Sequence, residues 1–178
     1  MLLDKPHAQA YQFNMTLFSD DPIGEDKNIP KTALVLGLAG VLPFVIFGLL
    51  SITFGGGLTT PKQADMWLIG YGAVILSFMA GIRWGLALTA HNESDQAVQM
   101  AVSVVPSLIA WAACFMPFAY GLPLLAFTHA ALAVWDIRAM HNGRGSVWYA
   151  KLRMILASLV FGILVLVGLA RYIHLLNG

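Results

Sequence analysis

The chain has 178 residues, of which 58% are hydrophobic and only 11% are charged, and its formal net charge is +1. Soluble domains typically carry about 25% charged residues, so this composition excludes a water-exposed surface and predicts the lipid bilayer as a partner. The near-zero net charge gives no reason to expect nucleic acid, and a single cysteine excludes a disulfide within one chain.

The first 31 residues differ from the rest in being polar and acidic. Residues 1–30 carry two lysines against five acids: Lys5, Lys27, Asp4, Asp20, Asp21, Glu25 and Asp26. A signal peptide needs a basic start followed closely by an apolar core, and this segment has neither. We interpret residues 1–31 as a retained polar tail outside the membrane, which could dock on a partner.

Five apolar stretches follow the tail. A bilayer core about 30 Å thick needs about 20 apolar residues in a helix. Helices are expected because a span in lipid must satisfy its own backbone hydrogen bonds, and these runs lack the alternating polarity of a barrel strand. The sequence therefore predicts an all-α polytopic membrane domain over residues 32–178. The expected spans are residues 32–54, 66–90, 98–120, 123–140 and 149–176.

Glycine, proline and polar residues mark the expected ends of these spans. Gly55-Gly56-Gly57 and Pro61 predict the loop after the first span, because both residue types interrupt helices. Polar residues 91–95 separate the second span from the third. Gly121-Leu122-Pro123 predicts a tight turn before a short fourth span.

Lysine and arginine are unevenly divided between the two sides of the membrane. We call the side that holds the N-terminus the N-terminal side, and the opposite one the C-terminal side. The C-terminal side has only Lys62 and Arg171, whereas the N-terminal side has Lys5, Lys27, Lys31, Arg138, Arg144, Lys151 and Arg153. Basic residues favour the cytoplasmic side, so we expect a cytoplasmic N-terminus and a C-terminus across the membrane.

Small residues recur every four positions along the second span. They are Ala73, Ser77, Gly81 and Gly85. Small side chains at this spacing let two helix backbones approach closely, so the row predicts a helix-packing face.

Arg83 lies on the opposite face of that span, about 10 Å inside the N-terminal boundary. Ionisable residues at such a depth face a partner or a cavity, or extend towards the headgroups. Asp136 is the only acid of the fourth span, and we predict that it approaches Arg83. The other candidate members of this intramembrane polar cluster are Trp84, Ser103, Ser107, Tyr149 and Arg153. The opposite leaflet is expected to be nearly all apolar.

The sequence lacks recognisable catalytic, metal and cofactor motifs. The five histidines share neither one depth nor a metal-ligand spacing, so neither haem nor zinc is predicted. A P-loop and a Gly-x-Ser-x-Gly elbow are missing, as are paired inverted repeats. We therefore predict no catalytic residue, no metal and no cofactor.

Several ordered motifs carry a resemblance to a known family. They are Leu36–Phe44, Tyr71–Phe78, Gly81–Gly85, Ser103–Trp111, Asp136–Arg138 and Trp148–Arg153. Over about residues 32–175 the chain resembles the small multi-pass proteins of bacterial and mitochondrial inner membranes that are similar to transmembrane protein 69, a domain of unknown function. The resemblance implies the membrane fold and, with the charge bias, a bacterial inner membrane with a periplasmic C-terminus. It implies no activity.

Three alternative hypotheses about function follow from these observations. The leading hypothesis is a non-enzymatic accessory or assembly subunit of a larger inner-membrane bioenergetic complex, whose partners are other membrane-protein subunits. The alternative is a binder or carrier of a small amphipathic molecule, such as a quinone or an anionic lipid, in the cytoplasmic leaflet. A membrane enzyme that uses Asp136 and Tyr149 is a third hypothesis.

Overall fold

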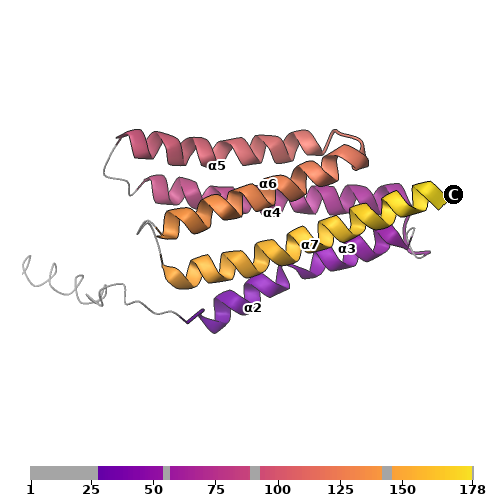
Figure 1. Ribbon diagram of the computed structural model, residues 1–178, viewed down its shortest axis with the longest axis horizontal. Coiled ribbons are helices and arrows are strands. Elements are labelled where there is room, and N and C mark those ends of the chain that lie inside the picture. The colour runs from indigo at the N-terminus through magenta and orange to yellow at the C-terminus, as the bar shows by residue number, and fades with distance from the viewer. Residues whose placement is uncertain (1–27, 54–56, 89–92, 142–145, 178) are drawn as a thin grey trace, which may run out of the picture.

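The computed structural model describes residues 28–53, 57–88, 93–141 and 146–177, and every regular element in these ranges is an α-helix (Figure 1). The helices are α2 (Lys31–Ala39), α3 (Leu42–Ile52), α4 (Pro61–Ala87), α5 (Glu93–Ala113), α6 (Phe118–His141) and α7 (Val147–Asn177). They supply five candidate membrane spans, with α2 and α3 forming one span together. The predicted all-α membrane fold with five spans is therefore confirmed. The predicted polar tail lies outside the described residues except for residues 28–31.

The first span is broken between α2 and α3. Pro43, the second residue of α3, has no backbone N–H, so the helical hydrogen-bond ladder cannot run unbroken through it. Tyr71 of α4 donates its hydroxyl to the Gly40 carbonyl at 2.9 Å. This bond satisfies a carbonyl at the break and ties the first span to α4.

Helix α4 begins earlier than the sequence predicts, at Pro61 instead of residue 66. Proline fits the first turn of a helix because the N–H groups there have no helical partner. Thr60 caps the helix by accepting a hydrogen bond from the Gln63 N–H at 3.2 Å. Asp65, which the predicted boundary leaves outside the span, therefore lies within the helix.

The turn between α5 and α6 also differs from the prediction. It falls at residues 114–117, so the expected turn at Gly121-Leu122-Pro123 is wrong, as are the long third span and the short fourth one. Helix α6 continues through Pro123. A Cβ atom at Gly121 would lie 2.8 Å from the Ala113 carbonyl oxygen, so glycine is needed for the close approach of α6 to the end of α5.

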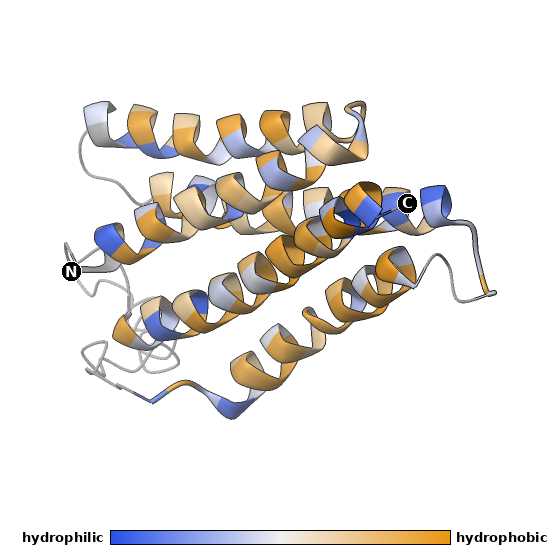
Figure 2. Cartoon of the chain, turned by 45° about the vertical axis from the view of Figure 1, so that its right-hand side comes forward, coloured by the Kyte–Doolittle hydropathy of each residue, from blue (hydrophilic) through white to orange (hydrophobic). Residues whose placement is uncertain are grey.

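Helix α4 contacts α3, α5 and α6, while α7 packs against α6, α3 and α2. Helix α2 begins and α7 ends at opposite ends of the bundle, as an odd number of spans requires (Figure 1). Hydrophobic residues run along the helices (Figure 2), and large ones such as Phe78 and Phe127 are exposed. An exposed apolar surface of this extent is what a lipid environment requires.

His129 lies in the core of the bundle, halfway along α6. Its Nε2 atom is 3.1 Å from the Gly72 carbonyl oxygen of α4, and its ring stands edge-on to Phe44 of α3. A Cβ atom at Gly72 would lie 3.3 Å from Leu125 Cδ1, so α4 packs closely against α6 at this point. Buried polar groups need a hydrogen-bond partner, and His129 has one, so it joins α6 to α4.

Candidate functional site

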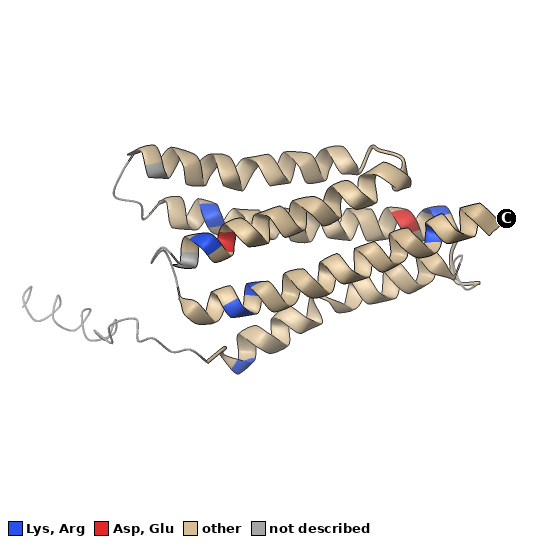
Figure 3. Cartoon of the chain, in the orientation of Figure 1, with Lys and Arg blue, Asp and Glu red and all other residues tan. Residues whose placement is uncertain are grey.

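Charged residues of three helices lie at the N-terminal side of the bundle (Figure 3), and three of their side chains meet in two ion pairs. Arg83 of α4 donates from Nε to Asp136 Oδ1 of α6 at 2.6 Å. Arg153 of α7 donates from Nε to the other carboxylate oxygen, Oδ2, at 2.7 Å. The predicted approach of Arg83 to Asp136 is confirmed, and the carboxylate bridges two guanidinium groups.

The depth of these residues places them just inside one face of the membrane. Arg83, Asp136 and Arg153 lie four, five and six residues from the ends of their helices. At the rise of an α-helix this corresponds to about 6–9 Å. The three charges thus share one level, near the boundary between headgroups and hydrocarbon.

These charged residues are nearly inaccessible. Arg83 is 1% exposed, Asp136 is 2% exposed and Arg153 is 3% exposed. Arg83 therefore does not extend along its helix towards the headgroups, which was the alternative to pairing inside the bundle. Charges at this burial require partners, since an unpaired ion in a low-dielectric interior is strongly destabilised.

Gln99 of α5 completes the cluster, and it is not among the residues predicted from the sequence. Its Oε1 atom accepts a hydrogen bond from Arg83 Nη1 at 3.1 Å. Gln99 precedes Ser103 by four residues, so both lie on one face of α5, and both are buried. This four-residue spacing in the sequence could have predicted that Gln99 lies on the face of α5 turned towards the other helices.

Three buried donors of the cluster have no hydrogen-bond partner within the described part of the chain: Arg83 Nη2, Arg153 Nη2 and the Tyr149 hydroxyl. Tyr149 lies within electrostatic reach of both arginines and of Asp136. Two guanidinium groups and one carboxylate leave one positive charge over. Surplus positive charge beside unused N–H and O–H donors is the chemistry of an anion site.

The two predicted serines do not join this network. Ser103 is buried but donates to the Met100 carbonyl at 2.7 Å. Ser107 donates to the Ser103 carbonyl at 3.2 Å. Both hydroxyl groups thus bond within α5, as serines in membrane helices often do, so neither of these two candidate members of the cluster hydrogen-bonds to Arg83 in the described structure.

The tryptophans beside the cluster face outwards. Trp84 is 46% exposed and Trp135 is 40% exposed. Each follows or precedes a charged member of the cluster directly in sequence, and adjacent residues on a helix point about 100° apart. Trp84 therefore lies on the lipid-facing surface and does not line a cavity with Arg83.

The predicted packing row on α4 divides into two halves. Ala73 is buried, and Ser77 is partly buried. Gly81 and Gly85 are exposed, and a Cβ atom at either would meet nothing within 4 Å. Within this chain the predicted close packing is therefore wrong for the two glycines, because α4 turns that part of its surface outwards.

A second cluster lies on the C-terminal side, where the sequence predicts an almost entirely apolar leaflet. Asp65 of α4 accepts from the Ser51 hydroxyl of α3 at 2.5 Å and from Arg171 Nη2 of α7 at 2.8 Å. The expectation of a nearly all-apolar leaflet is wrong. The predicted boundary leaves residue 65 outside the second span, and Arg171 is counted from the sequence only among the basic residues of the C-terminal side.

Within the described residues, no group of three or more His, Cys, Asp or Glu side chains could hold a metal ion. The arrangement of the cluster near Asp136 is instead cationic, with two arginines around one carboxylate. Such a site attracts negatively charged oxygen groups and repels metal cations.

Comparisons with known proteins agree with the membrane architecture. The chain is 43% identical over 89 residues to Transmembrane protein 69 of Xenopus tropicalis, and 35% identical over 85 residues to Transmembrane protein 69 of Mus musculus. These alignments cover 49% and 47% of this chain and 34% of each relative, so the matched part spans about a third of their length. No solved structure gives a significant match. The family model described as "Protein of unknown function (DUF3429)" matches residues 29–170, and the chain therefore belongs to that family.

Proposed function

We propose that this chain binds an anionic amphipathic molecule, such as an anionic lipid, at the cluster of Arg83, Asp136 and Arg153. The observation that carries the proposal is the set of three buried donors that have no hydrogen-bond partner among the described residues, beside one surplus positive charge. An unsatisfied buried donor costs about 1–3 kcal/mol, and more when it is charged. A phosphate or carboxylate group that reached these donors would accept hydrogen bonds from them and neutralise the surplus charge.

The position of the cluster favours an amphipathic ligand. The charged groups lie about 6–9 Å from the ends of their helices, where an acidic headgroup meets its apolar tail. A quinone, the other ligand considered, is neutral. Its carbonyl oxygens could accept hydrogen bonds from Arg83 and Arg153 but would leave the extra charge uncompensated, so an acidic ligand fits better.

Native mass spectrometry of protein released gently from its own membranes tests this proposal. The wild type should carry a stoichiometric anionic amphipathic molecule, and Arg83→Leu should lose it. Ser107→Ala is the matched control, because Ser107 also lies within a membrane span but hydrogen-bonds only within α5 in the described structure. Wild-type protein that carries no anionic ligand in mild detergent, or Arg83→Leu protein that keeps it, would contradict the proposal.

An accessory or assembly subunit of a larger membrane complex is the second candidate. One observation favours it: Arg83 and Arg153 are 1% and 3% exposed, and their network joins α4, α5, α6 and α7, as a purely architectural clamp would. Blue-native electrophoresis of gently solubilised membranes discriminates between the two candidates. Migration only as a monomer or homodimer argues against the subunit hypothesis.

We further propose a bacterial inner membrane as the location, with the N-terminal side in the cytoplasm and the C-terminus in the periplasm. Basic residues support this orientation: Lys31, Arg138 and Lys151 lie on the N-terminal side, against Lys62 and Arg171 on the other. Cysteine labelling tests it after the natural Cys114 is replaced by serine. Ser94→Cys should label from the cytoplasm and Asn177→Cys from outside, and labelling of both from one side would contradict the topology.

A further inference from the structure

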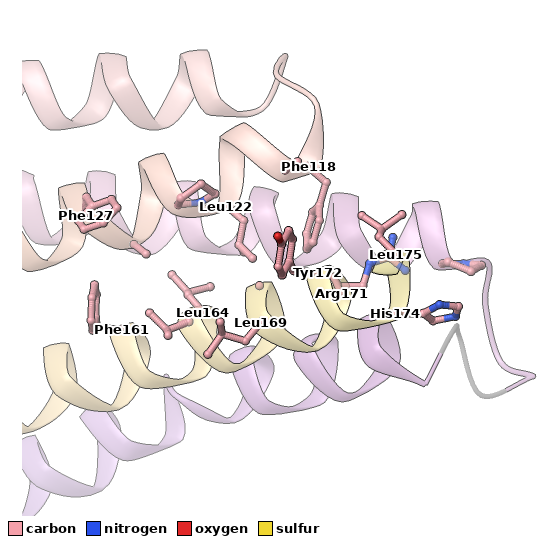
Figure 4. A pocket seen from close by; sticks show the side chains of 16 residues that line it. Phe118, Leu122, Phe127, Phe161, Leu164, Leu169, Arg171, Tyr172, His174 and Leu175 are labelled. Atoms are coloured by element: carbon pink, nitrogen blue, oxygen red, sulfur yellow. The ribbon is translucent and has the colours of Figure 1, made fainter. Parts of the chain in front are cut away.

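An apolar groove of about 790 Å³ runs between α6 and α7 on the C-terminal side of the bundle, away from the Arg83 cluster (Figure 4). Phe127 and Phe161 lie at its inner end, with ring centroids 6.2 Å apart. Leu122 and Leu164 line its middle. Leu169, which also lines it, is 53% exposed, so the groove opens on the outer surface of the bundle.

The groove has the length of one membrane leaflet. From Phe161 to Leu175 the lining residues of α7 span fourteen positions, or about 21 Å along the helix. Half of a bilayer core is about 15 Å thick, and the headgroup region adds several ångströms. A single acyl chain lying along the groove would therefore reach from the middle of the membrane to the C-terminal side.

The outer end of the groove is polar and positively charged. Arg171 and His174 lie there in Figure 4, and the Arg171 guanidinium carbon sits 5.6 Å from the centre of the Phe118 ring. Pro61, the first residue of α4, also lines this end, so the N-terminus of α4 lies beside it, and the exposed Lys62 is the next residue. Among the described side chains near this end, Lys62 and Arg171 exceed Asp65 by one positive charge.

We propose that this groove holds one acyl chain of an anionic glycerophospholipid from the leaflet of the C-terminal side, with its phosphate near Arg171 and Lys62. The apolar walls match the chain, the length matches a leaflet, and the charge at the mouth complements the phosphate. Phosphatidylcholine has the same chains but no net charge, so the mouth should select phosphatidylglycerol over it. The site is independent of the ligand proposed for the Arg83 cluster.

Two glycines of α7 provide a matched pair of variants. Gly168 lines the groove, and a Cβ atom there would lie 3.5 Å from Leu122 Cδ2, an ordinary contact distance. The backbone therefore accepts a Cβ atom at this position, and Gly168→Leu should place its side chain in the groove. Gly162 lies on the same helix, outside the groove lining, and a Cβ atom there would meet nothing within 4 Å. Gly162→Leu adds the same side chain to the same helix and leaves the groove open.

The experiment uses the full chain in nanodiscs of equal parts phosphatidylglycerol and phosphatidylcholine, followed by native mass spectrometry. The wild type and Gly162→Leu should retain one phosphatidylglycerol in preference to phosphatidylcholine, and Gly168→Leu should retain about tenfold less. Gly168→Leu should keep any ligand that depends on Arg83, which separates this site from the first one.

Equal retention by both glycine variants would overturn the proposal, as would equal retention of the two lipids. A wild-type dimer that carries no lipid would also overturn it, since a second copy would then cover the groove. If Gly168→Leu fails to fold, Val165→Trp carries the test, because Val165 lines the groove and is already 37% exposed. The same tenfold loss is expected of it.

Discussion

The two ion clusters of the bundle differ in charge balance and in exposure. On the N-terminal side one carboxylate, that of Asp136, serves Arg83 and Arg153, and none of the three residues is more than 3% exposed. On the C-terminal side Asp65 pairs with Arg171, whose side chain is 25% exposed. The first cluster carries a surplus positive charge within the described structure, whereas this second ion pair is balanced.

This difference shows which charges are needed to join helices and which charge needs another explanation. The balanced pair of Asp65 and Arg171 joins α4 to α7, and Ser51 adds α3. One arginine for each carboxylate is therefore enough to join helices in this fold. The second arginine at Asp136 adds a buried charge that costs free energy in an apolar interior. A bound anion would offset that cost, which a purely architectural role leaves unexplained.

The largest loss of stability is expected for Asp136→Leu. This change strands two neighbouring guanidinium groups, and breaking a buried ion pair by removing one partner costs about 3–5 kcal/mol. Thermal unfolding in detergent, followed by circular dichroism, measures the effect. Ser107→Ala is the control and should stay within about 0.5 kcal/mol of the wild type. A wild-type melting temperature for Asp136→Leu would show that the cluster does not stabilise the bundle.

A smaller loss, about 1.5–3 kcal/mol, is expected for Arg83→Leu, because Asp136 keeps Arg153 as a partner. The same unfolding assay should show that Arg83→Leu partly rescues Asp136→Leu, since one of the two stranded charges disappears. Strictly additive losses in the double variant would mean that the two side chains do not interact in the membrane protein.

The balanced pair should be less sensitive. Asp65→Asn should cost about 1 kcal/mol, because the partly exposed Arg171 side chain can reach the headgroups once its partner is neutral. Thermal unfolding of Asp65→Asn beside Asp136→Leu in one detergent makes the comparison direct. Equal losses in the two variants would remove the distinction between the clusters.

The sequence predicts the spans and the central ion pair because both follow from local chemistry. An acid and an arginine inside apolar runs at one depth have few partners other than each other, as Arg83 and Asp136 show. Five apolar runs likewise have few alternatives to five helices. These inferences need only the polarity of each residue and its depth in the membrane, and both can be estimated from the sequence.

Helix boundaries and rotations are set by packing, so they are less predictable. Asp65 was missed because Pro61 can end a loop or begin a helix, and only the capping by Thr60 distinguishes the two. Gly81 and Gly85 were placed at an interface because a row of small residues does not reveal which way its helix is turned. The outward position of Trp84 has the same cause, since neighbouring helices fix the rotation of α4.

The smallest effect on stability, and the sharpest test of the surplus-charge interpretation, is expected for Tyr149→Phe. The Tyr149 hydroxyl is buried without a hydrogen-bond partner in the described structure, so its removal breaks no bond and relieves an unsatisfied group. In protein stripped of lipid, unfolding should stay within about 0.5 kcal/mol of the wild type or shift towards greater stability. With its native anionic ligand retained, the wild type should melt higher than Tyr149→Phe, because only the wild type offers the third donor. If the Tyr149 hydroxyl only stabilised the fold, the results would be reversed. Tyr149→Phe would then destabilise the lipid-free protein and would retain the ligand as well as the wild type does.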